Sequence, residues 1–183
     1  RVLFRSDLLA EGRKFQKKRN HVNRFRAEHS QFELQNLTGG NFSAAQRMVG
    51  EWYRARMQAD PTGDYMMESI AMSRAFRHYE GLQMESAVLV ENGEILAVTM
   101  GSRLWSDTFD IHFEKAREDV DGAYAAVNCE FARYLRLKYP NLRYLNREDD
   151  VGLAGLRKAK LSYNPHHMVE KSWAYLAEDF HGD

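Results

Sequence analysis

The stretch Asn146-Arg147-Glu148-Asp149-Asp150-Val151-Gly152 follows directly after the short apolar segment 142–145. The next residues, 153–163, are predicted to form a helix, with Arg157 and Lys160 three residues apart on one face. The order of apolar and charged residues over 142–163 therefore predicts a strand, a charged junction and a helix. In α/β folds such a junction binds anionic or zwitterionic ligands, although a solvated loop with a local ion-pair cluster has the same spacing.

In the rest of the chain, hydrophobic periodicity predicts helices mainly in the first half and strands mainly in the second. Asn92-Gly93 between two apolar runs is a strong hairpin signal, and Ser43 is the expected N-cap of the second helix. Segment 108–115 alternates, which predicts one apolar face (Phe109, Ile111, Phe113) and one polar face (Asp110, His112, Glu114). The expected helices cover 8–29, 43–57, 65–79 and a segment beginning near 122; the expected strands cover 87–90, 95–101, 108–115, 142–145 and 167–176. This order predicts an α/β (α+β) protein with a mixed central sheet flanked by helices.

Composition limits the classes of protein that this chain can represent. Its 183 residues are 44% hydrophobic, which is enough for a globular core. No apolar run approaches the roughly 18 residues that span a bilayer. The one cysteine, Cys129, lies in a helical pattern. Because a single cysteine cannot form an internal disulfide, the composition suits a reducing compartment. We therefore expect a cytoplasmic protein, or one that binds peripherally at the inner face of the membrane.

Charge is unevenly distributed, although 26 basic and 26 acidic residues cancel over the whole chain. Segment 11–26 has seven basic residues and one acidic residue, a net charge of +6. A solvated helix face is the common meaning of such a run. The functional alternative is a surface for an RNA or an anionic lipid head group. The residues proposed for that surface are Arg13, Lys14, Lys17, Lys18 and Arg19.

The first six residues, 1–6, match the translation of a common sequencing-adapter end, and the chain has no initiator Met. We expect these residues to be a non-native translated leader. Residues 7–183 would then form a single domain whose N-terminal companion unit is missing.

Four parts of the chain resemble one protein family. They are Gly12-Arg13-Lys14-Phe15 with Lys18-Arg19-Asn20-His21, the strand 112–116, the helix start Asp121-Gly122-Ala123-Tyr124, and the block 146–165. Together they resemble the C-terminal domain family of phosphatidylglycerol lysyltransferases, in particular its soluble, stand-alone bacterial members. The pattern Asn-Arg-Glu-x-Asp-x-Gly-x-x-Gly-Leu-Arg-x-Ala-Lys-x-Ser-Tyr-x-Pro is long enough to be specific, and the resemblance covers nearly the whole chain after residue 7.

The resemblance implies the GNAT acyltransferase fold, in the doubled arrangement of aminoacyl-tRNA-dependent transferases, with this chain as the second GNAT unit. It implies an enzyme that moves an aminoacyl group from aminoacyl-tRNA to a hydroxyl or amine acceptor, such as a phosphatidylglycerol-like lipid. The partners would be tRNA and an anionic lipid head group, and no cofactor would be required. The membrane half of the best-known relatives has no counterpart here, so the resemblance bears on the transfer chemistry more directly than on the lipid acceptor.

Acyl transfer from an ester needs aligned reactants, a group that takes the proton of the nucleophile, and donors for the oxyanion. In a regular strand His112 and Glu114 share a face, and either could take the proton; imidazole titrates near neutrality. A surface pair on the exposed side of a sheet is the structural alternative. Lys115 would point to the opposite face and stand near the helix start at Gly122, as a cation for a phosphate or oxyanion.

The charged junction supplies the remaining catalytic candidates. Arg147 offers a guanidinium for a carboxyl or phosphate group, and Glu148 offers a carboxylate for the ammonium of an aminoacyl donor. Tyr124 or Tyr163 could stack on a terminal base, although such residues are more often core or edge residues. The proposed substrate-binding residues are Gly122, Tyr124, Asn128, Asn146, Asp150, Arg157, Lys160 and Tyr163.

The rival enzyme is an acetyl-CoA-dependent N-acetyltransferase, which cradles a pyrophosphate on a glycine-rich loop before a helix N-terminus. Segment 117–124 has one glycine preceded by three carboxylates, which would repel a pyrophosphate, and Tyr124 would crowd its approach. We therefore rank acetyl-CoA below aminoacyl-tRNA as the donor. A third interpretation is a non-catalytic GNAT-like module for pairing or ligand sensing.

The sequence has no recognisable metal motif, and we expect no metal. His166 and His167 are adjacent, and neighbouring strand residues point to opposite faces, so this pair is not suited to chelating one ion. There is also no Gly-x-Ser-x-Gly nucleophile elbow and no Walker loop.

Overall fold

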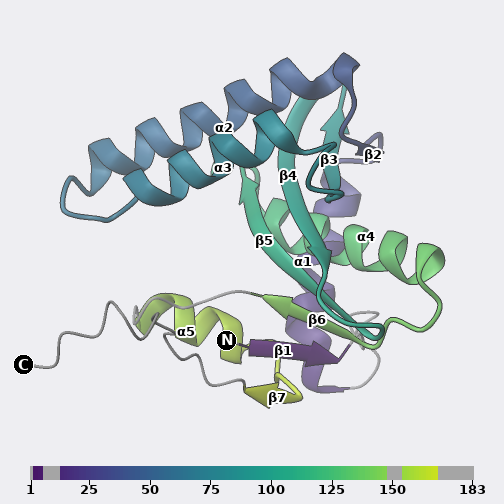
Figure 1. The fold of residues 1–183 in the computed structure, drawn as a ribbon. Coiled ribbons are helices and arrows are strands. Elements are labelled where there is room, and N and C mark those ends of the chain that lie inside the picture. The colour runs from purple at the N-terminus through teal and green to yellow at the C-terminus, as the bar shows by residue number, and fades with distance from the viewer. Residues whose placement is uncertain (1, 6–12, 148–153, 169–183) are drawn as a thin grey trace, which may run out of the picture.

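The computed structural model describes residues 2–5, 13–147 and 154–168. Within them, seven strands form one mixed sheet in the order β2-β3-β4-β5-β6-β1-β7 (Figure 1). Among these strands, β5 and β6 run parallel and every other neighbouring pair is antiparallel. The strands are β1 Val2–Arg5, β2 Glu33–Asn36, β3 Glu85–Glu91, β4 Glu94–Arg103, β5 Thr108–Ala116, β6 Tyr144–Arg147 and β7 His167–Met168.

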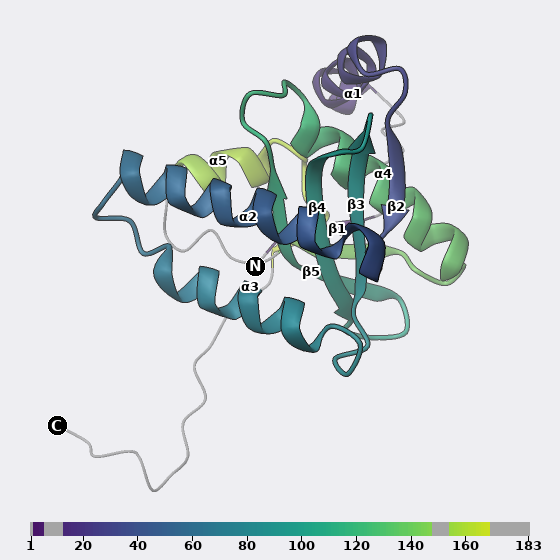
Figure 2. The same cartoon turned by 90° about the horizontal axis from the view of Figure 1, so that it is seen from above.

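Helices cover both faces of this sheet. Helices α2 and α3 lie on one face, and α4 lies on the other face with α1 against it (Figures 1 and 2). Their bounds are α1 Gln16–Glu28, α2 Gly39–Ala59, α3 Met66–His78, α4 Ala123–Lys138 and α5 Ala154–Leu161, with a short 3-10 helix at Arg13–Phe15. Each helix packs through apolar residues that recur every three or four positions, such as the buried Ala45, Met48 and Val49 of α2.

The predicted hairpin is confirmed, with a two-residue turn at Asn92-Gly93 between β3 and β4. Both turn residues have positive φ, 51° and 80°, the backbone that Asn and Gly tolerate best. The helix predicted at 65–79 is confirmed, but α2 begins before Ser43. Its N-cap is Thr38, whose backbone N–H donates to the side chain of Asn41 at 2.9 Å.

A β-bulge in β5 reverses the alternation of its side chains. Met100 of β4 pairs with Phe113 and Gly101 pairs with Ile111, which leaves His112 as the extra residue. Ile111 therefore packs toward α4, whereas Phe113 packs toward α2 and α3. The prediction that the apolar residues of this strand share one face is wrong, because a period of two does not reveal a bulge.

The two ends of the sheet differ from the prediction. Strand β2, at one edge, was not expected, since its four residues lack an apolar alternation. Residues 2–5 form β1 between β6 and β7, while the origin of residues 1–6 stays a prediction. The strand expected at 142–145 begins at Tyr144, and parts of the segments expected at 8–29 and 167–176 lie outside the described residues.

Candidate active site

Within the described residues, β6 pairs in parallel with the first part of β5. The register runs from Thr108–Tyr144 to Ile111–Arg147, and β5 itself extends to Ala116. Figure 1 shows the two strands diverging. Ligand sites of α/β sheets form where neighbouring strands separate at their carboxyl ends, so the side chains at this point are the first candidates for a site.

Glu114 and Arg147 form a buried ion pair across this separation. Nη2 of Arg147 donates to Oε1 of Glu114, and the two side chains are 17% and 6% exposed, respectively. Nδ2 of Asn128, from α4, donates to the other carboxylate oxygen at 3.2 Å. Oδ1 of Asn128 is buried and has no hydrogen-bond partner among the described residues. The predicted residues Glu114, Asn128 and Arg147 are thus brought together.

Tyr163, just after α5, and Lys18, on α1, complete the arrangement. The guanidinium of Arg147 lies 5.1 Å from the centre of the Tyr163 ring, and the ammonium of Lys18 lies 3.8 Å from the same centre. Lys18, which was predicted for the basic surface, is half-buried and its ammonium turns toward this ring, while its role in binding an RNA or a lipid stays a prediction. We call Lys18, Glu114, Asn128, Arg147 and Tyr163 the β5–β6 cluster.

Charge within the cluster is mixed, with positive charge in excess. Burial, together with the nearby charges of Arg147 and Lys17, lowers the pKa of Lys18 to about 8. Burial would also lower the pKa of Arg147, but Glu114 and Tyr163 raise it above its ordinary value. Burial raises the pKa of the Tyr163 phenol. At neutral pH the cluster therefore holds two cations and one carboxylate, which suits an anionic or strongly polarised carbonyl ligand.

Lys115 lies on the opposite face from Glu114, as predicted, but it is held by α3. Its ammonium donates to both carboxylate oxygens of Glu68 at 2.8 and 2.9 Å. It also lies 4.2 Å from the centre of the Trp52 ring, and its side chain is 8% exposed. The structure therefore pairs Lys115 with Glu68 instead of leaving it as a cation for a ligand at the start of α4.

The prediction that His112 and Glu114 share a face is wrong, because His112 is the bulged residue. Nε2 of His112 lies 2.8 Å from Oγ of Ser102, and its Nδ1 lies 3.9 Å from Oδ2 of Asp110. Asp110 alternates with neighbours that face α4, so it points to the side of α2 and α3. Asn146, 1% exposed, donates to Asp110 at 2.7 Å and belongs to this second group instead of the β5–β6 cluster.

The start of α4 is shaped by packing. Gly122 is the N-cap and has a φ of 81°, in the left-handed region. A Cβ there would lie 3.0 Å from the carbonyl oxygen of His21 and 3.1 Å from Cβ of Phe25, so this glycine lets α1 pack closely against α4. Tyr124 is 36% exposed, and burial raises the pKa of its phenol to about 12, with the backbone of Ala116 acting in the opposite sense.

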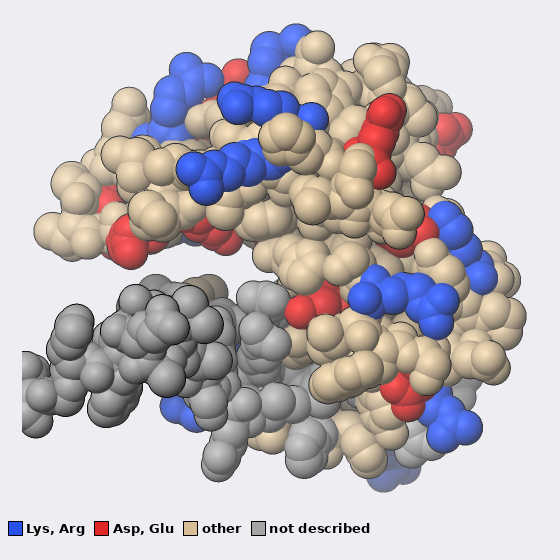
Figure 3. All heavy atoms as spheres, in the orientation of Figure 1, with Lys and Arg blue, Asp and Glu red and all other residues tan. Residues whose placement is uncertain are grey.

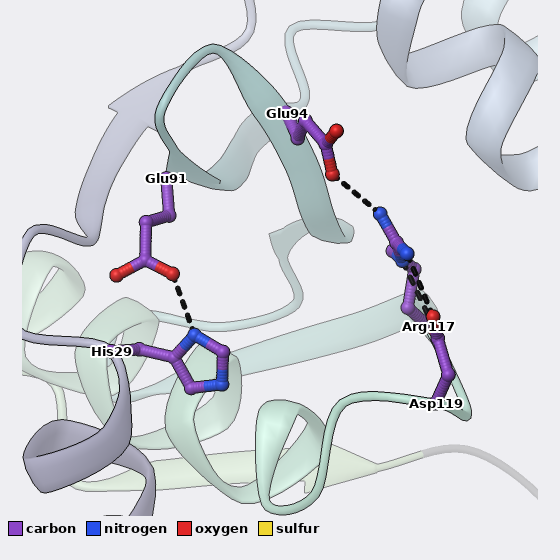
Figure 4. A network of polar contacts seen from close by, with 5 residues as sticks. All are labelled: His29, Glu91, Glu94, Arg117 and Asp119. Atoms are coloured by element: carbon purple, nitrogen blue, oxygen red, sulfur yellow. Dashed lines mark hydrogen bonds and ion pairs between the residues drawn. The ribbon is translucent and has the colours of Figure 1, made fainter.

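Each carboxylate that precedes α4 is paired with an arginine. Arg117 bridges Asp119 and Glu94, at 2.7 Å each (Figure 4). The other two pairs are Arg56 with Glu118 and Arg24 with Asp121. These arginines offset the negative charge that the sequence places before α4. Repulsion of a pyrophosphate is therefore a weaker argument against acetyl-CoA in the folded chain than in the sequence.

Basic side chains gather on two surfaces. Arg13 of the 3-10 helix and Lys17 of α1 are exposed, whereas Arg19 of α1 is half-buried and donates to Gln16. A second basic surface over α2 and α3 was missed by the sequence analysis, although arginines at helical spacing could have revealed it (Figure 3). Its exposed residues are Arg47, Arg54, Arg74 and Arg77.

The remaining predicted residues are not placed in the cluster. Arg157 is exposed and Lys160 is half-buried on α5. Glu148 and Asp150 lie outside the described residues, as does the side chain of Lys14, so their proposed roles stay predictions.

A groove of about 650 Å³ lies between α2, the β3–β4 turn and segment 117–119. Met48, Trp52 and Ile95 form its apolar part, and the charged residues at its rim include Arg47, Glu51, Glu94, Arg117 and Asp119. No residue of the β5–β6 cluster lines this groove. It is a separate feature beside the loop that leads into α4.

The mixed sheet, the diverging parallel strands and the helix that begins at the charged loop define a GNAT-like acyltransferase fold. A possible acetyltransferase from Clostridium difficile 630 has the same fold, with a TM-score of 0.58 at 10% identity over 80% of this chain and 97% of its own. The chain belongs to the family described as phosphatidylglycerol lysyltransferase, C-terminal, whose model matches residues 2–175.

Two longer solved structures are also similar. A conserved protein of unknown function from Bacteroides thetaiotaomicron VPI-5482 is 37% identical, with a TM-score of 0.83 over 91% of this chain and 56% of that one. L-PGS from Bacillus licheniformis is 15% identical, with a TM-score of 0.60 over 90% of this chain and 56% of that one, and shows the shared fold. This chain thus spans a little over half the length of these relatives. No curated protein matches it. None of the described helices is long and apolar enough to cross a membrane.

Proposed function

We propose that this chain transfers an aminoacyl group from aminoacyl-tRNA to a hydroxyl or amine acceptor, with a phosphatidylglycerol-like lipid as the first acceptor to test. Membership of the lysyltransferase family supports acyl transfer. The β5–β6 cluster is the observation that carries the proposal, because it gathers two cations, a carboxylate and a phenol where two strands separate.

The cluster matches the charge that develops on an aminoacyl ester during transfer. When the acceptor attacks, the carbonyl oxygen becomes an oxyanion, which Lys18 and Arg147 would stabilise. Glu114 would hold the guanidinium of Arg147 in place. Because burial raises the pKa of Tyr163, its hydroxyl stays protonated and can donate a hydrogen bond to the leaving oxygen. Glu148 remains the proposed partner for the ammonium of the donor.

His112 is the proposed general base. It lies beside Ser102 and Asp110, on the side of the sheet that faces α2 and α3. Its side chain is 29% exposed, and its imidazole already contacts the hydroxyl of Ser102. In the transfer step the acceptor oxygen or nitrogen bonds to the ester carbon, and its proton passes to His112. The bond to the ribose oxygen of the tRNA breaks, and that oxygen leaves with a proton.

Acetyl-CoA remains the second candidate for the donor, and two observations favour it. The carboxylates before α4 are offset by arginines, so the start of this helix does not repel a pyrophosphate strongly. The groove of about 650 Å³ also adjoins segment 117–119 and offers space beside the same loop.

The deciding experiment incubates the purified chain with radiolabelled aminoacyl-tRNA pools and, separately, with labelled acetyl-CoA, in the presence of lipid and peptide acceptors. Label transferred from tRNA supports the first proposal, and label transferred from the thioester alone replaces it with the second. Inactivity with both donors favours a non-catalytic binding module. Lys18→Met and Tyr163→Phe should lose transfer, whereas Arg136→Met, at an exposed position of α4, should not.

A further inference from the structure

Three side chains outside the β5–β6 cluster have the arrangement of an activated nucleophile. Oγ of Ser102 lies 2.8 Å from Nε2 of His112, and Nδ1 of the same imidazole lies 3.9 Å from Oδ2 of Asp110. The imidazole is thus flanked by a hydroxyl on one nitrogen and a carboxylate on the other. This order of groups is recognised by geometry and not by sequence position.

The surroundings fix the carboxylate and leave the hydroxyl accessible. Asp110 is 3% exposed, and its Oδ1 accepts a hydrogen bond of 2.7 Å from Asn146. Ser102 and His112 are half-buried, so both residues keep part of their surface in contact with solvent. A buried carboxylate beside the half-buried imidazole stabilises the positive charge that the ring acquires when it takes a proton.

The β-bulge creates this arrangement. Because His112 is the extra residue of β5, it does not alternate to the α4 face and stays beside Ser102 and Asp110. Gly101 allows the strands to come close there, since a Cβ at this position would lie 2.2 Å from the carbonyl oxygen of Asp110 and 2.5 Å from the ring of Phe109. Bulges of this kind redirect side chains at functional sites.

We propose that Ser102, His112 and Asp110 form a nucleophilic site that accepts an acyl group from an activated carboxylic ester. Oγ of Ser102 attacks the ester carbon, the proton of the hydroxyl passes to Nε2 of His112, and the alcohol leaves with that proton. Water then attacks the serine ester through the same imidazole, releases the carboxylic acid and restores the hydroxyl. Ser102 and His112 are the catalytic residues, and Asp110 is a positioning residue.

This site shares His112 with the proposed aminoacyl transfer, but it needs neither tRNA nor the β5–β6 cluster. The two proposals can therefore fail separately. Transfer from aminoacyl-tRNA without acylation of Ser102 would refute the serine site alone. Acylation of Ser102 without transfer from tRNA would leave the serine site standing.

The test uses p-nitrophenyl acetate as the probe, with release of p-nitrophenol followed by absorbance and the acetylated residue mapped by mass spectrometry. The wild-type chain should release p-nitrophenol and carry acetyl on Ser102. Ser102→Ala should abolish this acetylation, and His112→Asn should slow it by about 10²-fold or more. Asp110→Asn should slow it by at least about 10-fold without a change in melting temperature, since it keeps the shape and removes the charge.

Ser106→Ala is the matched control, because Ser106 is an exposed serine in the turn that follows β4. It should leave both the rate and the labelled residue unchanged. Acetyl found only on lysines or on other serines, or equal release of p-nitrophenol by the wild type and Ser102→Ala, would overturn the proposal. Circular dichroism of each variant separates loss of the nucleophile from loss of the fold.

Discussion

Glu114 and Arg147 are joined in one buried ion pair, although Glu114 lies beyond the last described pairing of β5 with β6. Ile111 and Arg147 are the last partners of β5 and β6 among the described residues, so the ion pair lies at the end of the described pairing. Desolvation makes such a pair costly unless each charge keeps its partner.

Arg147→Ala should lower the free energy of unfolding by about 3 kcal/mol, because it leaves the carboxylate of Glu114 buried without its cation. The double variant Glu114→Gln/Arg147→Met should recover much of this loss, since neither side chain then carries a charge. Urea unfolding measures both. Arg136→Ala, at an exposed position of α4, is the control and should change stability by less than about 0.5 kcal/mol. Equal losses in the single and double variants would contradict the burial argument.

Glu68→Gln should destabilise the chain more than Lys115→Met does. The side chain of Lys115 is 8% exposed and that of Glu68 is 41% exposed. Removal of the carboxylate strands a buried ammonium, whereas removal of the ammonium leaves a carboxylate that water can reach. Urea unfolding of the two variants measures the difference in their free energies of unfolding. A larger decrease for Lys115→Met than for Glu68→Gln would contradict the prediction.

Stability should rise with pH between about 8 and 10 because of Lys18. Its pKa is about 8 in the folded chain against an ordinary value of 10.5, so the unfolded chain binds more protons in this window. Above pH 10 the raised pKa of Tyr124, about 12, acts in the opposite sense, because the unfolded phenol loses its proton first. Denaturant unfolding across this range should show the rise in the wild type and not in Lys18→Met.

Gly101→Ala should destabilise the fold by about 1–3 kcal/mol or more, because the added methyl group would overlap the carbonyl oxygen of Asp110. Gly50→Ala is the matched control. Gly50 lies inside α2, and a Cβ there would meet nothing within 4 Å, so this change should stabilise by roughly 0.5–1 kcal/mol. Thermal unfolding of both variants checks the prediction, and a neutral Gly101→Ala would show that the strands can part at the bulge.

Reversal of charge at Arg13 and Lys17 should weaken binding of uncharged (deacylated) tRNA and flatten its salt dependence by about 0.7–0.9 logarithmic units per lost phosphate contact. Reversal of charge at Arg47 and Arg54 tests in the same way whether the second basic surface binds tRNA. Arg136→Glu on α4 is the control. Fluorescence anisotropy at several salt concentrations measures the slopes, and a surface whose reversal leaves the slope unchanged is an ordinary solvated helix face.

Much of the site could be predicted from residue types and spacing. The strand before Arg147 and the helix that contains Asn128 both follow from apolar periodicity, and Arg147 was singled out by the charged junction. The half-buried environment of Lys18 could not be predicted, because helical spacing cannot show that α1 turns one basic residue toward Tyr163. Ser102 and Asp110 were missed as site residues, since their geometry depends on a bulge that no local pattern marks.

Local sequence pattern was enough to predict α2, α3, α4 and the strands β3 to β6, together with the Asn92-Gly93 turn and the buried faces of the helices. Those features depend on backbone preferences and periodicity, which act over a few residues. Tertiary structure alone decided which charges meet: Arg147 with Glu114, Lys115 with Glu68 and His112 with Ser102. Each of these pairs joins residues at least ten positions apart, and strand register and helix packing bring them within contact distance.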